Sequence, residues 1–206
     1  PGLIEKGRIE GLKLLEMQRH SLRMYTSCGW FFADLAGLET RLILQHAARA
    51  IQLAEELTGQ EIEGKFLKLL SEGRSNLAEM GDGSQVYQRF VKPRCVTLEQ
   101  VVNHFAISSL FDDEEREKRI FSFRVEKKSY ERMERNNQLF ILGQVRVTPD
   151  IIPEPKEFLF GLISSKKDIF QTWLSRDENV PSFEALKEKG RQYLEKGEAE
   201  EVAKLF

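Results

Sequence analysis

The hydrophobic pattern of this chain changes its period once, and this change constrains the fold more than any other feature. Along Leu38–Leu57, as in most of the first 111 residues, apolar positions recur every three or four residues, which is typical of amphipathic helices. After the charged stretch Asp112–Arg119, apolar and polar residues alternate, as in Phe121–Val125, which is typical of a half-buried strand. Helices followed by strands predict an α+β fold, mainly helical: an antiparallel helix bundle over residues 1–111, then a small antiparallel β-meander and C-terminal helices over residues 112–206, packed as one unit.

Capping and turn residues divide both parts into elements. Gly59 suits the end of the clearest helix, and Thr97 with Gln100 has the spacing of a capping box. Ser182 is expected to cap a further helix, with an acidic tail helix after it. The expected helices span residues 9–24, 38–57, 61–71, 84–92 and 97–109. The expected strands span residues 121–125, 139–147 and 158–162, and turns are expected at Asn136–Asn137 and over residues 149–155.

Composition excludes several classes of protein. Apolar residues make up 41% and charged residues 31% of the 206 residues, the balance of a soluble globular chain. The net charge of −2 argues against a protein that binds nucleic acid. Because no apolar run reaches the roughly 18 residues of a membrane span and no secretory leader is visible, we expect a cytoplasmic protein with no membrane contact. The chain opens with Pro1 instead of methionine, so we expect a piece of a longer polypeptide.

Motifs for phosphate loops, serine hydrolases and zinc proteases are missing from the sequence. Two cysteines, Cys28 and Cys95, are too few for a disulfide framework. His20, His46 and His104 lack partners at metal-ligand spacing, and hydrogen-bonded histidines at helix surfaces are the expected alternative. We therefore expect no catalytic residue, no metal and no cofactor in this chain.

One segment, Met24–Asp34, differs in composition from the helices around it. Small residues from Thr26 to Gly29 precede three aromatic residues from Trp30 to Phe32. Small residues allow close approach of a backbone, and an aromatic ring offers a flat face for a pyranose ring while polar neighbours meet its hydroxyls. The segment thus suits a sugar-binding surface. Its candidate substrate-binding residues are Trp30, Tyr25, Ser27, Phe31, Cys28, Asp34, Glu16 and His20.

Each of these residues also has a structural interpretation. Trp30 would then be the core residue of a helix junction, and Cys28 would be a small buried thiol. Asp34 would cap a turn or the first turn of the next helix. Glu16 and His20, four residues apart on one helix, would simply pair with each other.

Several stretches of the chain resemble one known family, the C-terminal domain of unknown function 3536. This domain occurs in bacterial proteins whose N-terminal part is a glycoside hydrolase of family 57. The likeness covers about residues 10 to 145, and its longest block is Met24–Phe32. The other similar stretches are Asp34, Gly37, Glu39-Thr40, Ala47–Ala54, Gly81–Gly83, Val86-Tyr87 and Ala106–Phe111.

The resemblance implies an α-glucan-active context. In family 57 the catalytic carboxylates lie on an incomplete (β/α) barrel, and a helical domain that follows the barrel closes over its cleft with a tryptophan-rich segment. Trp30 falls on the tryptophan of that segment, and Phe31-Phe32 fall on the aromatic residues after it. Thr26 and Gly29 stand where acidic residues are usual, which argues against a charged contribution and leaves a stacking role open. The barrel is absent from this chain, so no residue corresponds to the family's nucleophile or general acid.

Three functions are compatible with the sequence. The first is an accessory domain of an amylase-like or branching-enzyme-like glycoside hydrolase; its partners would be the N-terminal catalytic barrel of the same polypeptide and an oligosaccharide or α-glucan. The second is a structural module that packs on the barrel without touching sugar. The third is an independent enzyme that uses Cys28 as its nucleophile, which requires an exposed thiolate of lowered pKa.

Overall fold

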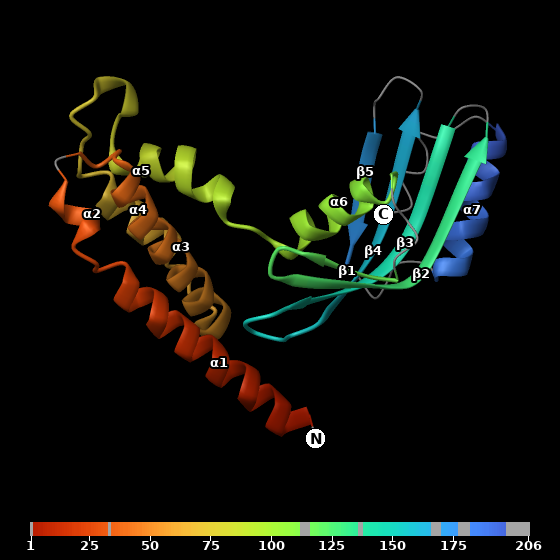
Figure 1. Ribbon diagram of the computed structural model, residues 1–206, viewed down its shortest axis with the longest axis horizontal. Coiled ribbons are helices and arrows are strands. Elements are labelled where there is room, and N and C mark those ends of the chain that lie inside the picture. The colour runs from red at the N-terminus through yellow and green to blue at the C-terminus, as the bar shows by residue number, and fades with distance from the viewer. Residues whose placement is uncertain are drawn as a thin grey trace. The chain divides into compact units, whose positions relative to one another are not determined.

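The computed structural model describes residues 2–32, 34–111, 116–135, 138–165, 170–176 and 182–196 (Figure 1). The chain divides into two compact units, Pro1–Val96 and Thr97–Phe206. In the part of the chain described, helices form the first unit, and a five-stranded antiparallel sheet with two helices forms the second. The α+β fold is therefore confirmed. The division expected after residue 111 falls before Thr97 instead, because the helix that begins there packs on the sheet.

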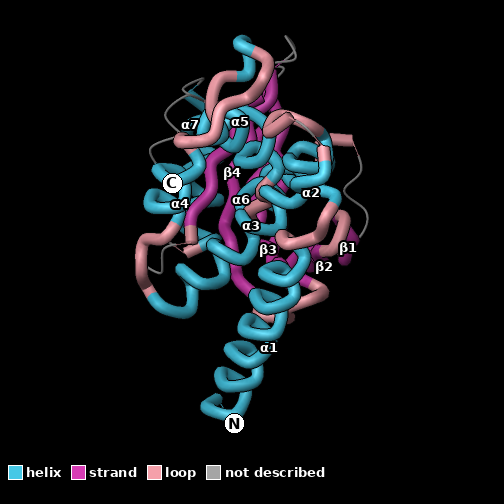
Figure 2. Tube along the Cα trace, turned by 90° about the vertical axis from the view of Figure 1, so that its left-hand side faces the viewer, coloured by secondary structure: helices cyan, strands magenta, loops and turns pink. Residues whose placement is uncertain are grey.

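Two long helices form the frame of the first unit. Its elements are α1 (Gly2–Arg23), α2 (Cys28–Phe31), α3 (Leu38–Thr58), α4 (Glu63–Leu70), η1 (Ala78–Met80), α5 (Gly83–Val86), η2 (Tyr87–Val91) and η3 (Lys92–Arg94). Helix α3 returns alongside α1, as Figure 1 and Figure 2 both show. Leu44 and Ala48 of α3 pack with Tyr87 and Val91 in the core of this unit. None of the described helices is both long and apolar enough to cross a lipid bilayer.

The end of α3 and the start of α4 follow from local signals. Gly59 adopts a left-handed φ of 68°, and its N–H donates to the Glu55 carbonyl, which ends α3 as the sequence predicts. The Glu55 carboxylate accepts the N–H groups of Ile62 and Glu63 at 2.7 and 2.8 Å. One side chain therefore satisfies two of the free donors at the start of α4.

Two helices of the first unit differ from the expected ones. Helix α1 begins at Gly2 and not at residue 9, because its exposed Leu3 and Ile4 belong to no buried face that would mark a period. The single helix expected over residues 84–92 is part of three consecutive pieces, in which the winding passes from α to π over Tyr87–Val91 and then to 3-10 over Lys92–Arg94. Such changes hardly alter the spacing of apolar residues, so the sequence pattern does not reveal them.

The second unit is a meander enclosed by two helices. Its elements are α6 (Leu98–Ser108), β1 (Glu117–Ile120), β2 (Phe123–Arg135), β3 (Gln138–Pro149), β4 (Lys156–Ser165), β5 (Phe170–Ser175) and α7 (Phe183–Lys196). The strands lie in the order β1-β2-β3-β4-β5, and each pairs with its neighbour in antiparallel direction.

Helices α6 and α7 pack on opposite faces of this sheet (Figure 1). Along β3, Ile141 and Val145 lie in the core that α6 completes, whereas Phe140 and Leu142 lie in the core that α7 completes. Because both faces are buried, apolar residues occupy successive positions of the strand and not every second one.

The sequence pattern misses β1 and β5 and places the boundaries of β2 wrongly. Ile120 pairs with Phe123, so Phe121 and Ser122 form the tight turn between β1 and β2. Phe121 is exposed and has a positive φ of 53°. The alternation from Phe121 to Val125 thus spans a turn and the start of a strand, and it ends well before Arg135, the true end of β2.

Both expected helix caps of the second unit are confirmed. Thr97 and Gln100 form the reciprocal hydrogen bonds of a capping box at the start of α6. The Ala185 N–H donates to Ser182 Oγ at 3.3 Å at the start of α7. The predicted turn at Asn136–Asn137 and the acidic tail helix lie outside the described residues.

Candidate functional site

A group of large aromatic side chains is exposed at and beside α2. The exposed fraction is 75% for Tyr25, 70% for Trp30, 74% for Phe31 and 53% for Phe32. The rings of Phe31 and Phe32 meet edge to face, with centroids 5.4 Å apart. Trp30 is therefore not the core residue of a helix junction within this chain. We call Tyr25, Trp30, Phe31 and Phe32 the aromatic surface.

A buried glycine positions this surface. A Cβ atom at Gly29 would lie 2.6 Å from both Cγ1 and Cγ2 of Ile43, so a larger residue collides with α3. Thr40 of α3 donates its hydroxyl to the Gly29 carbonyl at 3.1 Å. The small residue allows close approach of α2 to α3, and not of a ligand to the backbone. With Gly29 packed inwards, the side chain of the next residue, Trp30, points to solvent.

Asp34 closes the loop that follows α2. Its carboxylate accepts the N–H groups of Ala36 and Asn76, both at 2.7 Å, and the hydroxyl of Ser75 at 3.0 and 3.1 Å. The backbone hydrogen bonds from Ala36 and Asn76 hold the pKa of Asp34 below its ordinary value. The acceptor sites of this carboxylate are engaged with the protein, so Asp34 acts as a clamp between two loops, in keeping with its structural interpretation.

Glu16 and His20 begin a chain of hydrogen bonds that crosses from α1 to α3. Arg19 donates to the buried Glu16 carboxylate, at 2.8 Å between Nε and Oε2. His20 Nε2 lies 3.1 Å from Glu16 Oε1, and His20 Nδ1 lies 2.9 Å from Nδ1 of His46. The hydrogen bond from Arg19 lowers the pKa of Glu16, whereas burial lowers the pKa values of both histidines. We call Glu16, His20 and His46 the histidine relay.

The remaining predicted site residues, Ser27 and Cys28, are both exposed. Cys28 is the first residue of α2 and is not buried, which contradicts its structural interpretation. Among the described residues, no histidine forms a hydrogen bond with its thiol. Over the same residues, no group of three or more histidine, cysteine, aspartate or glutamate side chains is arranged to hold a metal ion.

An apolar hollow of about 210 Å³ lies among α1, α3 and the start of α4. Sulfur-containing and aromatic side chains face the alanine-rich side of α3 across it. Its lining residues are Met17, Ser21, Met24, Ala47, Ala50, Ile51, Ala54, Ile62 and Phe66. The hollow marks the side of the α1–α3 pair that is packed less tightly.

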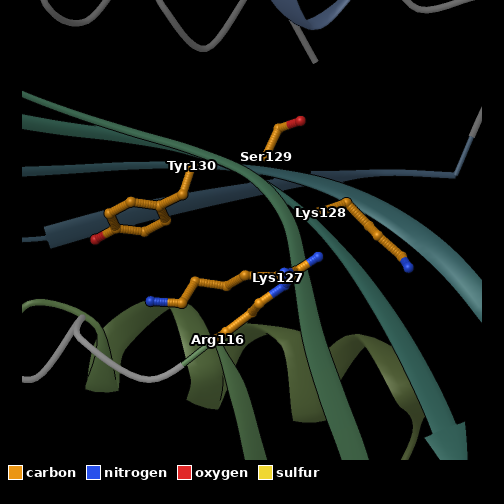
Figure 3. A pocket seen from close by; sticks show the side chains of 5 residues that line it. All are labelled: Arg116, Lys127, Lys128, Ser129 and Tyr130. Carbon is orange, nitrogen blue, oxygen red and sulfur yellow. The ribbon is translucent and has the colours of Figure 1, made fainter.

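A basic hollow of about 300 Å³ lies in the second unit, where β2 has a bulge between Lys127 and Ser129 (Figure 3). It is lined by Arg116, Lys127, Lys128, Ser129 and Tyr130. In Figure 3 Lys127 and Tyr130 extend to one side of the strand and Lys128 to the other. Lys128 is paired with Glu126 at 2.9 Å. Because the two lysines extend to opposite sides of the strand, they do not converge on one anion.

A hydrogen-bonded histidine at position 46 was the expected alternative, but its partner, His20, was not predicted. His46 is 26 positions from His20, and no local spacing links two residues on different helices. Its position on the side of α3 that faces α1 is visible only after the two helices pair. The exposed aromatic residues, in contrast, carried a compositional signal.

The geometry defines an α+β chain with a helical unit that displays aromatic side chains and a second unit built on an enclosed antiparallel meander. The chain belongs to the family described as "Domain of unknown function (DUF3536)", which it matches over residues 2–206. The match includes both units and continues beyond residue 145, where the resemblance was expected to fade. No curated protein and no solved structure matches the chain.

Proposed function

We propose that this chain is the C-terminal accessory domain of a glycoside hydrolase family 57-like protein of the α-glucan class. In this role it covers the cleft of a catalytic barrel in the same polypeptide and binds sugar through the aromatic surface. The observation that carries the proposal is the exposure of Trp30 and Phe31 on α2, which Gly29 holds against α3, with the exposed Tyr25 in the turn before this helix. Membership of the DUF3536 family supports the resemblance from which the family 57 context is drawn.

The physical chemistry of the aromatic surface favours a ligand or a partner. Covering apolar surface stabilises a complex by roughly 25 cal/mol per Å², and several large exposed apolar side chains within one short segment favour an interaction site. A pyranose ring fits such a surface because its apolar face lies flat on an indole while its hydroxyls stay solvated. The exposed thiol of Cys28 suits the reducing cytoplasm, which is the location we propose.

A second candidate function is a structural module that packs on the barrel without contacting sugar. Leu38 and Leu42, on the first two turns of α3, are both exposed and lie on one face of that helix. Leucine side chains offer no hydrogen bonds to a sugar, but they suit the apolar core of a protein interface.

Direct binding to the chain tests the first function. Trp30 and Trp173 are its two tryptophans, so a Trp173→Phe background leaves Trp30 as the fluorescent reporter. Titration with maltoheptaose is expected to shift and quench this emission. In isothermal titration calorimetry, Trp30→Ala is expected to weaken binding about tenfold, or ~1.4 kcal/mol. The matched control is Phe111→Ala, because Phe111 is an exposed aromatic residue of the second unit.

Activity of the full-length polypeptide separates the two functions. With starch or maltooligosaccharides as substrate, Trp30→Ala is expected to lower kcat/KM if the indole contacts sugar. Unchanged kinetics, together with weaker association of the variant chain with a separately produced barrel, would contradict the sugar-binding function and favour the structural module.

A further inference from the structure

The histidine relay has one arrangement of protons that satisfies all its hydrogen bonds when both histidines are neutral. The Glu16 carboxylate, ionised beside Arg19, can only accept, so His20 carries its proton on Nε2. His20 Nδ1 is then an acceptor, and the proton between the two rings belongs to His46 Nδ1. Neutral His46 is left with a lone pair on Nε2. Burial, which lowers the pKa values of both rings, favours this neutral state.

His46 Nε2 is accessible to solvent. The hydrogen bond of the His46 ring is made through Nδ1, and its ring contact is with the tilted ring of His20 at 5.0 Å. Over the described residues, the buried side-chain polar atoms without a partner are Arg41 Nε and Asn103 Oδ1, and His46 Nε2 is not among them. The relay therefore ends in an acceptor that is exposed to solvent.

This acceptor belongs to the helix on which α2 packs. His46 follows Ile43 by three positions on α3, so it is about one turn from the contact that holds Gly29. On α1, the His20 carbonyl accepts the N–H of Met24 at 3.0 Å, in the last turn before Tyr25. His20 is thus in the last turn of α1 before Tyr25, and His46 is about one turn along α3 from the residue that packs on Gly29.

We propose that His46 Nε2 accepts a hydrogen bond from a hydroxyl of the glucan that stacks on Trp30, and that Glu16 and His20 position His46 by fixing its tautomer. This inference rests on the proposed function and adds a binding residue to it. A hydroxyl beside a stacked sugar ring is the donor that such a lone pair requires. His46 is the binding residue in this scheme, whereas Glu16 and His20 act through it.

Binding is expected to weaken on acidification. A proton on Nε2 removes the acceptor, and a proton on His20 Nδ1 breaks the bond between the rings. The charged groups that act on the pair are Glu16, Arg19 and Arg23 of α1. Both arginines disfavour a protonated His46, so the neutral form prevails at neutral pH.

Nuclear magnetic resonance tests the relay independently of any sugar. Long-range ¹H–¹⁵N spectra of the chain at pH 8 are expected to show His46 protonated on Nδ1 and His20 on Nε2. A His46 ring protonated on Nε2 overturns the inference whatever the chain binds. Glu16→Gln, which keeps the size of the side chain, is expected to yield a mixture of tautomers.

Titration calorimetry with maltoheptaose tests the contact itself. His46→Phe keeps a ring but removes the acceptor, and it is expected to weaken binding about tenfold at pH 8. His46→Gln offers an amide oxygen near the position of Nε2, and it is expected to restore most of the affinity and to abolish the pH dependence. His104→Phe, at the exposed histidine of the second unit, is the matched control. Thermal unfolding verifies that each variant is folded.

The outcomes distinguish this inference from the proposed function. If Trp30→Ala abolishes binding while folded His46→Phe binds as the wild type does, the sugar-binding function stands and the contact with His46 is overturned. If the wild-type chain binds no maltoheptaose at pH 8, both are overturned. If His46→Phe lowers the affinity for maltoheptaose and His46→Gln restores it, the inference is supported.

Discussion

The two units differ in how much of their apolar surface they cover themselves. In the second, α6 and α7 close both faces of the sheet, and of its described residues only Phe111, Phe121 and Ile151 are large, apolar and exposed. In the first, three helices expose many such side chains. On α1, on α2 and at the start of α3 these are Leu3, Ile4, Leu14, Leu15, Leu22, Trp30, Phe31, Leu38 and Leu42. Two helices suffice to enclose a sheet, whereas a layer of helices stays open on its outer side.

The largest expected effect concerns the enclosed core of the second unit. Phe160 is fully buried, and its ring meets that of Phe105 edge-on at 6.0 Å. Phe160→Ala leaves a cavity and is expected to lower the free energy of unfolding by about 3–5 kcal/mol, measured by urea denaturation. Phe111→Ala, whose side chain is 86% exposed, is the matched control and is expected to change it by less than about 0.5 kcal/mol. Equal effects of the two changes would contradict an enclosed sheet.

A smaller effect is expected where α2 packs on α3. Gly29→Ala places a methyl group against Ile43 and is expected to cost about 1–3 kcal/mol, and to weaken glucan binding by displacing Trp30. The control is Gly11→Ala in α1, where a Cβ meets no atom within 4 Å. That change is expected to stabilise the chain by about 0.5–1 kcal/mol. If the two variants have the same free energy of unfolding, the contact between Gly29 and Ile43 does not hold α2 in place.

The pH dependence of stability sharpens the comparison, since the histidine relay lies only in the first unit. The pKa values of His20 and His46 are lowered on folding, so below the ordinary histidine value of about 6.5 the unfolded chain binds more protons than the folded one. The contribution of the two neutral histidines to the free energy of unfolding is complete above that pH. It is lost as the pH falls through their pKa values in the folded chain.

Urea denaturation at pH 8 and pH 5.5 measures this loss. Substitution of both relay histidines by asparagine is expected to reduce the difference between the free energies of unfolding at the two pH values. If the free energy of unfolding falls by the same amount between pH 8 and pH 5.5 in the double variant and in the wild type, the pH dependence originates elsewhere in the chain.

The smallest effect on stability is expected at the most conspicuous residue. Trp30 contributes little to the core of this chain, so Trp30→Ala is expected to change the free energy of unfolding by less than about 0.5 kcal/mol. This contrasts with its expected effect on glucan binding. A loss above about 2 kcal/mol in the chain by itself would mean that the indole is buried in solution.

The sequence predicted elements better than it predicted contacts. The end of α3 at Gly59 and the capping box at Thr97 depend on residues within one turn of the chain, and both are present. The strands β1 and β5 were missed, because an edge strand in a meander is determined by the neighbour with which it pairs. Residues 84–92 were assigned to one helix because their apolar spacing does not distinguish α from π winding.

The candidate site divides in the same way. Composition alone singled out the aromatic segment, but it assigned the small residues to ligand approach, whereas Gly29 serves the packing of α2 on α3. Asp34 was a candidate for sugar binding, and its loop partners Ser75 and Asn76, more than 40 positions away, show it to be a clamp.

What the sequence by itself determined is the order of helices and strands, the caps that bound several of them, and the presence of an unusual aromatic segment. These depend on backbone propensities and on hydrogen bonds between residues close in the chain. Only the tertiary structure decided which side chains face solvent and that His46 completes the relay with Glu16 and His20. Burial and the pairing of distant polar groups depend on which surfaces meet in space, and no local pattern of residues encodes that meeting.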